Sequence, residues 1–390
     1  MSKTLQDYAT LINDTIQSNE INHYITTDNM CQNLGGIDTL KNINIPQGKV
    51  RSFQKDDVLL SNIRLYFRKV YRAKQKGGCS SDVLVFRAKH IDSATLFAIL
   101  SSQIFTDYAC SGSQGSKMPR GNKTHMMDFK IPTINFTIAK IFNSIQNKIE
   151  NNHKINELLH KILELLYEQY FVRFDFLDEN NKPYQTSGGK MKFSKELNRL
   201  IPNDFEVKTL GELITWISGS QPPKSCHIYE HKEGYIRFIQ NRDYSSNDYI
   251  TYIPISKNNK ICYQYDIMID KYGEAGAVRF GLQGAYNVAL SKISVLNQSM
   301  QEYIRSYLNS KPIKKYLSNA CMASTRSSLN ENHIYSLMLP IPPINLLQKY
   351  EKIAKNIITS IIKNNQATQT LTALRDFLLP LLLKQQVKPQ

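Results

Sequence analysis

The chain contains an internal repeat, and this feature restricts its fold more than any other. Residues 111–132, SGSQGSKMPRGNKTHMMDFKIP, match residues 319–340, NACMASTRSSLNENHIYSLMLP, when the two are shifted by 208 positions, so that Asn122 falls on Asn330. The match continues on both sides with offsets between 205 and 213, and KTLQDYATLIND near the start resembles KTLGELITWISG from Lys208. A repeat of this length predicts a globular half followed by a helix, present twice.

Each half ends in a segment whose seam residues are spaced alternately four and three apart, the pattern of a coiled coil. An asparagine lies near the middle of each seam, and a core asparagine fixes register and orientation at a cost in stability. The predicted helix-pairing residues are Ile141, Ile145, Lys148, Asn152, Ile155, Leu159, Ile162 and Leu166 in the first helix, and Ile353, Ile357, Ser360, Asn364, Ala367, Leu371, Leu374, Leu378 and Leu381 in the second.

Two arrangements of these helices are compatible with the spacing. Each could be an ordinary amphipathic helix packed on its own domain. The duplication favours an antiparallel pair, because two long helices one repeat apart can bury their seams against each other.

Length and composition agree with a two-domain chain. With 390 residues, 41% of them hydrophobic, there is enough chain for two domains that each have a core. We predict a mixed α/β (α+β) fold with two pseudo-repeated globular domains and two long antiparallel coiled-coil helices. The predicted boundaries are 1–133 for the first domain, 134–180 for the first long helix, 181–203 for a linker, 204–343 for the second domain and 344–390 for the second long helix.

The charge indicates a polyanionic partner. The net charge is +16 and the pI is about 9.4, and nucleic acid is favoured over a membrane because no basic amphipathic anchor or lipidation motif is present. An apolar run long enough to span a bilayer is also lacking, since FLLPLLL is short and broken by Pro380. With no secretory signal, we expect a cytoplasmic protein.

The positive charge is concentrated in two segments of the first half. Residues 62–77, NIRLYFRKVYRAKQKG, contain six basic residues and no acidic one, and an extended conformation would place most of them on one face beside Tyr66. A solvated strand edge is the alternative, because edge cations discourage aggregation. The predicted DNA contacts are Arg64, Arg68, Arg72, Lys74, Lys117, Arg120 and Lys123 in the first half, and Arg237, Arg242, Lys271 and Arg326 in the second.

The glycine-rich segment in the first half does not fit a phosphate-binding loop. Gly115 and Gly121 are one residue too far apart for G-x-x-x-x-G-K-[ST], and Asn122 separates Gly121 from Lys123. The adenine-methyltransferase motif [DNS]-P-P-[YF], H-E-x-x-H and G-x-S-x-G are also missing. We therefore predict no catalytic residue and no enzymatic activity in this chain.

The cysteines and histidines give little sign of a metal site. The six cysteines show no C-x-x-C spacing, which favours reduced, buried thiols over zinc ligands or disulfides. Cys226, His227 and His231 could bind a metal only if a fourth ligand came from elsewhere. We predict no metal site.

Several stretches resemble the specificity subunit of type I restriction-modification systems. These are KTLGELITWISGSQP, DDVLLSNIRLYFRKV, CSSDVLVF and the SGSQG loop that leads into KIP. The run IENNHKINELLHKILELLYEQYFVRFDF, followed by SGGKMKFSKELNRLIPNDFEVKTL, is the most distinctive, and the resemblance covers essentially the whole chain. Such subunits consist of two target-recognition domains joined by two helical regions.

This resemblance implies recognition of double-stranded DNA without catalysis. Each domain reads one half of a bipartite, asymmetric site, and the helices set the gap and dock two methyltransferase subunits, with restriction (translocase) subunits joining through them. S-adenosylmethionine, Mg and ATP are then expected on those partner subunits, with no cofactor in this chain. A methylation-only or related defence assembly would use the same subunit. The alternative from another class is an adaptor for a structured RNA or an acidic protein.

Overall fold

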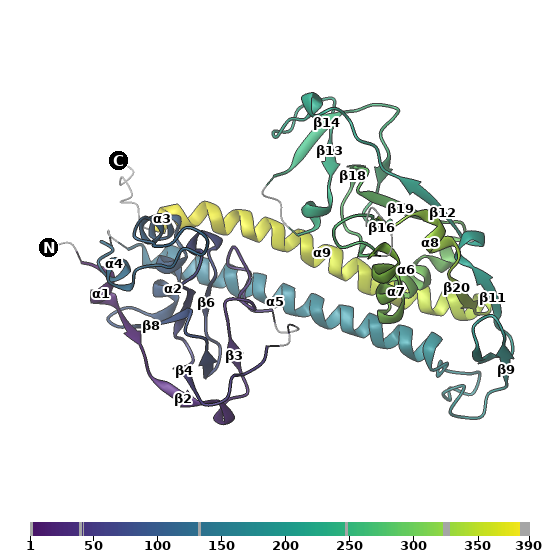
Figure 1. Cartoon of the computed structure of the whole chain (residues 1–390), viewed down its shortest axis with the longest axis horizontal. Helices are drawn as coiled ribbons and strands as arrows, with labels where there is room; N and C mark the ends of the chain where they lie inside the picture. Colours follow the sequence, from purple (N-terminus) through teal and green to yellow (C-terminus); the bar gives the residue numbers. More distant parts are fainter. Residues whose placement is uncertain are drawn as a thin grey trace. The chain divides into compact units, whose positions relative to one another are not determined.

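The chain forms two compact units, each built from strands and helices (Figure 1). The computed structural model describes residues 3–38, 41, 43–131, 134–245, 249–322 and 328–382. Unit 1 comprises Met1–Ile155 and Asn364–Gln390, and unit 2 comprises Asn156–Lys363. The predicted mixed α/β fold class is confirmed.

Unit 1 contains two four-stranded sheets and the helices that cover them. The first sheet has the order β1 (Ala9–Ile12), β8 (Val83–Ala88), β5 (Val58–Ser61) and β6 (Val70–Arg72), and all its pairings are antiparallel. The second has the order β2 (Thr15–Gln17), β4 (Lys49–Phe53), β7 (Gly77–Cys79) and β3 (Tyr24–Ile25), with β3 parallel to β7. The helices are α1 (Leu5–Tyr8), α2 (Ser93–Ser101), α3 (Gln103–Ser111), α4 (Lys123–Met127), the first part of α5 (Phe136–Tyr167) and the last part of α9 (Ile344–Leu382).

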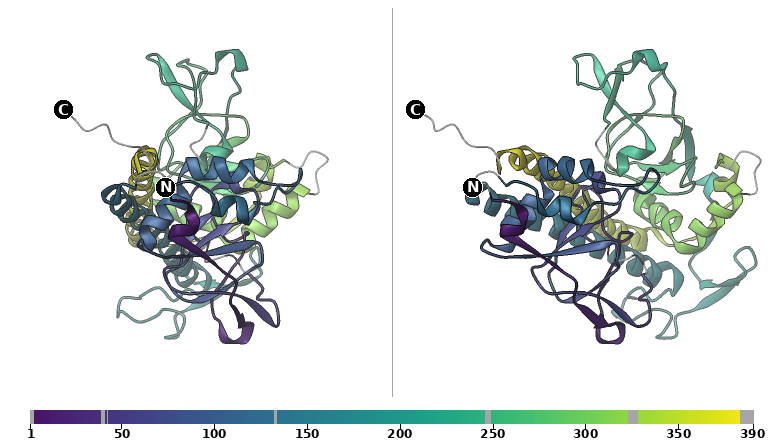
Figure 2. Two further views of the ribbon diagram at one scale, coloured as in Figure 1. Left: turned by 90° about the vertical axis from the view of Figure 1, so that its left-hand side faces the viewer. Right: turned by 60° about the vertical axis from the view of Figure 1, so that its left-hand side comes forward.

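The core of unit 1 follows from the alternation of side chains along its central strand. On β8, Leu84 and Phe86 join the cluster formed with α2 and α5, while Val83 and Val85 join a cluster on the other face of the sheet. This is the period-two pattern of a strand that is buried on both faces. The end of α9, in yellow beside the dark blue elements in Figures 1 and 2, adds Leu379 to the first cluster.

Unit 2 repeats this plan. Its sheets have the orders β12 (Ile214–Ser218), β19 (Leu290–Val295), β16 (Ile267–Asp270), β17 (Val278–Arg279), and β14 (Thr251–Pro254), β13 (Tyr235–Ile239), β18 (Gly284–Tyr286), β15 (Ile261–Cys262). Two shorter pairs are β9 (Met191–Ser194) with β10 (Arg199–Pro202), and β11 (Glu206–Thr209) with β20 (Met338–Ile341). The helices are α6 (Gln301–Asn309), α7 (Lys311–Met322), α8 (Glu331–Tyr335), the end of α5 and the start of α9.

The two units match element by element. The order β12-β19-β16-β17 reproduces β1-β8-β5-β6, and β13-β18-β15 reproduces β3-β7-β4, including the parallel pair. The sheets that contain these parallel pairs differ at one edge, since β2 pairs with β4 in unit 1 but β14 pairs with β13 in unit 2. The repeat predicted from the sequence is therefore a repeat of topology.

Helix starts are repeated at the level of single hydrogen bonds. The Asn122 side chain accepts from the His125 backbone N–H at 3.1 Å, and the Asn330 side chain accepts from that of His333 at 3.3 Å. Both asparagines are N-caps, which satisfy a backbone donor that has no partner within the helix. The match of Asn122 with Asn330 thus reflects the same local requirement in both units.

The two long helices are antiparallel. In unit 1, the Asn152 Nδ2 donates to Thr368 Oγ1 at 3.1 Å, and the Gln146 Oε1 accepts from Arg375 Nη1 at 3.2 Å. The partner on α9 changes from Thr368 to Arg375 as the position on α5 goes back from Asn152 to Gln146, so the two helices run in opposite directions, as predicted. Asn152 is 2% exposed, as expected for a seam position, but its partner is Thr368.

The predicted seam is correct at alternate positions only. Ile145, Asn152, Leu159 and Leu166 are buried or half-buried, whereas Ile141, Ile155 and Ile162 are 44%, 43% and 48% exposed and Lys148 is exposed. One position after each exposed residue, Phe142, Ile149 and Asn156 are buried and Leu163 is half-buried.

The second helix shows the same shift. Ile353 and Leu374 are 42% and 44% exposed, and the predicted seam positions Ser360 and Ala367 are also exposed. Ala354, Ile361 and Arg375, each one position later than a predicted residue, are buried. Ile357, Asn364, Leu371, Leu378 and Leu381 are half-buried. Adjacent positions such as Ile141 and Phe142 are both apolar, so 3–4 and 4–3 spacings fit the sequence equally well and packing decides between them.

Two predicted segments contain other structure. The first long helix was expected over 134–180, but α5 ends at Tyr167 and continues only as a π-helical turn over Glu168–Val172. Phe174 has a φ of 54°, a left-handed value that a helix does not accept. The segment 181–203, expected to be a linker, contains the β9–β10 hairpin. No helix in the described part of the chain is long and apolar enough to cross a bilayer.

Candidate nucleic-acid interface

The basic segment 62–77 is not one extended strand, so the predicted single basic face is wrong. Leu65–Phe67 form a 3-10 turn, and Arg64 and Arg68 at its two ends both have a φ of 49°. These left-handed residues reverse the chain on each side of the turn and break the alternation. The turn forms because Leu65 is 4% exposed and anchors it in the core.

The turn is bonded to the second basic segment of unit 1. The Arg64 N–H donates to the Pro119 carbonyl at 2.9 Å, and the Gly121 N–H donates to the Asn62 carbonyl at 3.1 Å. A Cβ on Gly121 would lie 2.8 Å from Leu65 Cδ1 and still closer to Met126 Cε, so a larger residue there would displace these side chains. The structure thus brings the two predicted basic clusters together into one surface.

Three of the predicted cations are engaged by the protein itself. The Arg68 guanidinium donates to the Ser101 carbonyl at 3.0 Å, and burial lowers the pKa of Arg68. Arg72 lies 3.7 Å from Asp56, and Lys74 Nζ lies 3.2 Å from Glu150. Because their charges are used within unit 1, these residues are weak candidates for phosphate contacts.

Other cations face solvent. Lys117 and Lys123 are exposed, and Arg120 is 62% exposed although its Nη2 lies 3.0 Å from Asp82 Oδ1. Arg64 is half-buried and donates to the Lys117 carbonyl at 3.4 Å. Lysines and arginines held outward on bonded loops suit phosphate contacts, which position a protein on DNA.

Two large apolar side chains project from the same loops. Tyr66 is 53% exposed on the 3-10 turn, and Met118 is 54% exposed in the loop that carries Lys117. The sequence placed Tyr66 beside the cations, where an aromatic side chain suits base or sugar contacts, but it gave no such indication for Met118. A methionine between charged and glycine residues in a loop was the signal that could have identified it.

Unit 2 contains the corresponding loop pairing. The Leu329 N–H donates to the Lys271 carbonyl at 3.0 Å, at the position equivalent to Gly121 and Asn62. The Lys271 ammonium lies 5.9 Å from the ring centre of Tyr272, which is 45% exposed. Arg326, the predicted contact in the partner loop, lies outside the described residues.

A second bond brings Arg242 toward Lys271. The Asn241 Nδ2 donates to the Tyr272 carbonyl at 3.3 Å, which links the turn Asn241–Tyr244 to the loop after β16. Arg242 is 52% exposed and its guanidinium lies 5.7 Å from the ring centre of Tyr249, itself 67% exposed. Burial raises the pKa of the adjacent Asp243. Among the predicted contacts of unit 2, Arg242 and Lys271 therefore lie on loops that are bonded to each other, whereas Arg237 is half-buried on strand β13.

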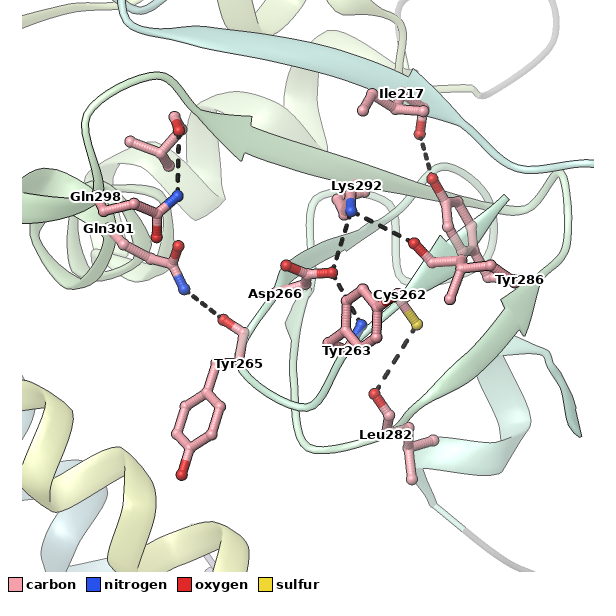
Figure 3. Close-up of polar contacts among 12 residues, drawn as sticks. Ile217, Cys262, Tyr263, Tyr265, Asp266, Leu282, Tyr286, Lys292, Gln298 and Gln301 are labelled. Carbon is pink, nitrogen blue, oxygen red and sulfur yellow. Dashed lines mark hydrogen bonds and ion pairs between the residues drawn. The ribbon is translucent and has the colours of Figure 1, made fainter. Parts of the chain in front are cut away.

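Several polar contacts stabilise the region around β15 in the sheet β14-β13-β18-β15 of unit 2 (Figure 3). Lys292 Nζ donates to the Ile261 carbonyl at 3.3 Å and lies 3.2 Å from Asp266 Oδ2, which also accepts from the Tyr263 N–H at 2.9 Å. The Gln301 side chain donates to the Tyr265 carbonyl at 2.6 Å. These bonds hold the turn before β16 and leave Tyr263 57% exposed.

The predicted weak metal candidate is not assembled. His227 packs against Phe238 with ring centres 5.2 Å apart, and His231 packs against Tyr252 at 5.4 Å. Within the described ranges, no three His, Cys, Asp or Glu side chains are grouped as metal ligands. Cys79, Cys262 and Cys321 are buried, and burial raises the pKa of Cys79 and Cys262 to about 12.

Known proteins resemble this chain in sequence and in fold. Residues 202–373 match the family Methylase_S, the type I restriction modification DNA specificity domain. The type I restriction enzyme MjaIX specificity subunit of Methanocaldococcus jannaschii is 24% identical over 300 residues, which are 74% of this chain and 67% of that protein. The MjaVIII specificity subunit of the same organism is 23% identical over 174 residues, 43% of this chain and 40% of that protein.

The fold has a counterpart among solved structures. The crystal structure of a type I restriction-modification system S subunit from M. genitalium superposes with a TM-score of 0.63 at 14% identity, covering 99% of this chain and 96% of that one. At this identity the likeness concerns the fold. The sequence matches are to the family that the sequence resembles, over residues 202–373 for the family itself and over 74% of this chain for the MjaIX subunit.

Proposed function

We propose that this chain, a type I restriction-modification specificity subunit, reads a bipartite, asymmetric DNA site with one unit per half-site. The observation that carries the proposal is the repeated loop pairing, Asn62 with Gly121 in unit 1 and Lys271 with Leu329 in unit 2. The same backbone arrangement presents different side chains in the two units. Two similar readers with different side chains suit a site whose halves differ in sequence.

Phosphate contacts are assigned to the outward-facing cations of both units. In unit 1 these are the exposed Lys117 and Lys123, together with Arg120, which is 62% exposed although it pairs with Asp82. In unit 2 they are the exposed Arg242 and the half-buried Lys271. The net charge of +16 supports this assignment, since releasing counterions from DNA drives such binding.

The chemistry is assigned to partner subunits. The family is named for DNA specificity, and the sequence lacks the methyltransferase and nucleotide-binding motifs. S-adenosylmethionine, Mg and ATP would then bind to methyltransferase and restriction subunits, and this chain would carry out recognition. A cytoplasmic location stays a prediction.

Two methyltransferase subunits are the proposed protein partners, with restriction subunits where the system contains a nuclease. On the unit 2 part of α5, Leu158, Ile162 and Leu165 are 57%, 48% and 47% exposed. They are spaced four and three residues apart, which places them on one face of the helix. Ile162 was predicted to pair the two long helices, and its exposure supports a role in docking.

The long helices are also proposed to set the gap between the half-sites. Each of them contributes residues to both units, and the buried Asn152–Thr368 bond constrains their register in unit 1. An adaptor for a structured RNA or an acidic protein is not favoured, because the matched family is one of DNA specificity. Competition between duplex DNA and RNA at equal salt would separate these functions.

The decisive experiment is a genome-wide map of methylated adenines in the source cell, with and without this gene. Loss of a split motif, two short defined halves around an undefined gap, is the expected result. If the protein and a partner methyltransferase are both expressed and every motif persists without the gene, the proposed function is wrong.

A further inference from the structure

We propose that Tyr66 and Met118 contact base edges in the half-site read by unit 1, while Arg64 and Arg68 act as positioning residues that hold the Tyr66 turn. This inference rests on the proposed function and names the side chains that would determine specificity in one half-site. It assigns the contacts with base edges to the large side chains of Tyr66 and Met118, in place of the arginines that the sequence indicated as DNA contacts.

The turn that carries Tyr66 is strained and firmly held. Left-handed φ values are strained at non-glycine residues and cluster at functional sites, and Arg64 and Arg68 both have a φ of 49°. The Phe67 carbonyl accepts from the Asn33 N–H at 2.9 Å, and the Arg68 carbonyl accepts from the Leu34 N–H at 3.1 Å.

Side chains hold the same turn. Arg68 donates to the Ser101 carbonyl at 3.0 Å, and the Arg64 guanidinium lies 6.0 Å from the ring centre of Phe67. Leu65 is buried beneath the turn, whereas Tyr66 is 53% exposed. The surrounding bonds therefore maintain a conformation whose main effect is to project Tyr66 into solvent.

Met118 is presented by a separate tight loop. The N–H of Gln114 donates to the Arg120 carbonyl at 2.9 Å, and the N–H of Arg120 donates to the Gln114 carbonyl at 2.9 Å. This reciprocal pair closes a tip over residues 115–119, in which Gly115 has a φ of 98°. Lys117 and Met118 project from that tip, next to the residue 64 backbone that is bonded to Pro119.

The charge around these side chains identifies their partner. Lys117 and Arg120 lie in the same loop as Met118, and Lys123 follows that loop at the start of α4; exposed cations of this kind attract the phosphates of DNA. Phosphate contacts carry no sequence information, which has to come from side chains that reach base edges. An aromatic ring can contact the thymine methyl group, and a methionine can wedge between base steps.

The test uses Tyr66→Ala and Met118→Ala in the full complex, with Ile45→Ala as a matched control. Ile45 is an apolar residue of unit 1 that is 37% exposed and belongs to neither of the two loops. In cells, each loop variant should methylate sites that are relaxed at one or more base pairs of a single half, while the other half stays unchanged. The control should keep the wild-type motif.

Binding by the purified complex supplies a second measurement. Discrimination between the cognate half-site and a mismatched one should fall by about 5- to 150-fold, the range expected for one base contact. Affinity for unrelated DNA and its dependence on salt should stay at the wild-type level. Tyr66→Phe, which keeps the ring, should retain most of the discrimination.

The outcomes separate this inference from the proposed function. If the wild type shows no split motif, the proposed function fails first. If the wild type shows one and both alanine variants keep the same motif and discrimination, the inference is overturned. It is also overturned if the variants lose affinity for all DNA equally, or if they keep the motif but lose assembly with the partner subunits, because the side chains would then contact the backbone or a protein. Met118→Ala keeps the test valid if Tyr66→Ala does not fold, since Met118 lies at an exposed tip.

Discussion

Removing Lys117 and Lys123 together should reduce both the affinity for DNA and its dependence on salt. Both side chains are exposed in unit 1, and neither forms an ion pair with an acidic side chain among the described residues. Their charges are therefore available to phosphates. We expect Lys117→Ala/Lys123→Ala to act on every DNA sequence alike, because phosphate contacts are independent of sequence.

The magnitude follows from the number of available charges. Each phosphate neutralised on B-DNA contributes about 0.9 to the slope of log affinity against log salt. Two lysines should lower that slope by about 1.8, so between 50 and 200 mM salt the wild type should lose about 12-fold more affinity than the variant.

Titration of labelled duplex DNA at several salt concentrations measures this slope. Lys74→Ala is the matched control, because it removes the same charge from the same basic region. Lys74 Nζ already lies 2.7 Å from Asn147 Oδ1 and 3.2 Å from Glu150, so its charge is used within unit 1. Its slope should equal that of the wild type.

Two results would refute this reasoning. An unchanged slope in the double variant would mean that the exposed loop does not contact phosphates. An equal loss in Lys74→Ala would mean that the contacts seen for Lys74 do not decide which cations face DNA.

Three further predictions concern stability, pH and the gap. Phe142→Ala should destabilise unit 1 by about 3–5 kcal/mol, because the Phe142 side chain is fully buried and its ring centre lies 5.5 Å from that of Phe97. A loss below about 1 kcal/mol in denaturant unfolding would contradict this. Burial raises the pKa of the Glu351 carboxyl from its ordinary 4.5 to about 7, so the folded state binds the carboxyl proton more tightly than the unfolded state does. The free energy of unfolding should therefore fall as pH rises from about 4.5 to about 7. Allowing for screening of a half-buried carboxyl, the loss should be about 1–2 kcal/mol, and melting of Glu351→Gln against pH should lack it. Seven residues inserted in each long helix, after Ile155 and before Asn364, should lengthen the gap in the methylated motif by about three base pairs. This follows from a rise of about 1.5 Å per helical residue and about 3.4 Å per base pair. An unchanged gap would show that the helices do not measure it.

The sequence alone was sufficient for features that depend on neighbouring residues. The repeat appears in both units as the same strand order and the same asparagine N-caps, because caps and turns depend on residues a few positions apart. The resemblance to type I specificity subunits could also be seen in the sequence, because the run that carries most of it lies in one continuous stretch.

Features that depend on distant contacts were decided by the tertiary structure. The seam phase is one of them, since Ile141 and Phe142 are both apolar and only packing buries Phe142. The role of each cation is another. Lys74 and Lys117 have the same chemistry, but Glu150 lies 3.2 Å from Lys74 while Lys117 stays exposed. The fold places an acidic partner beside Lys74, and among the described residues Lys117 has no ion pair.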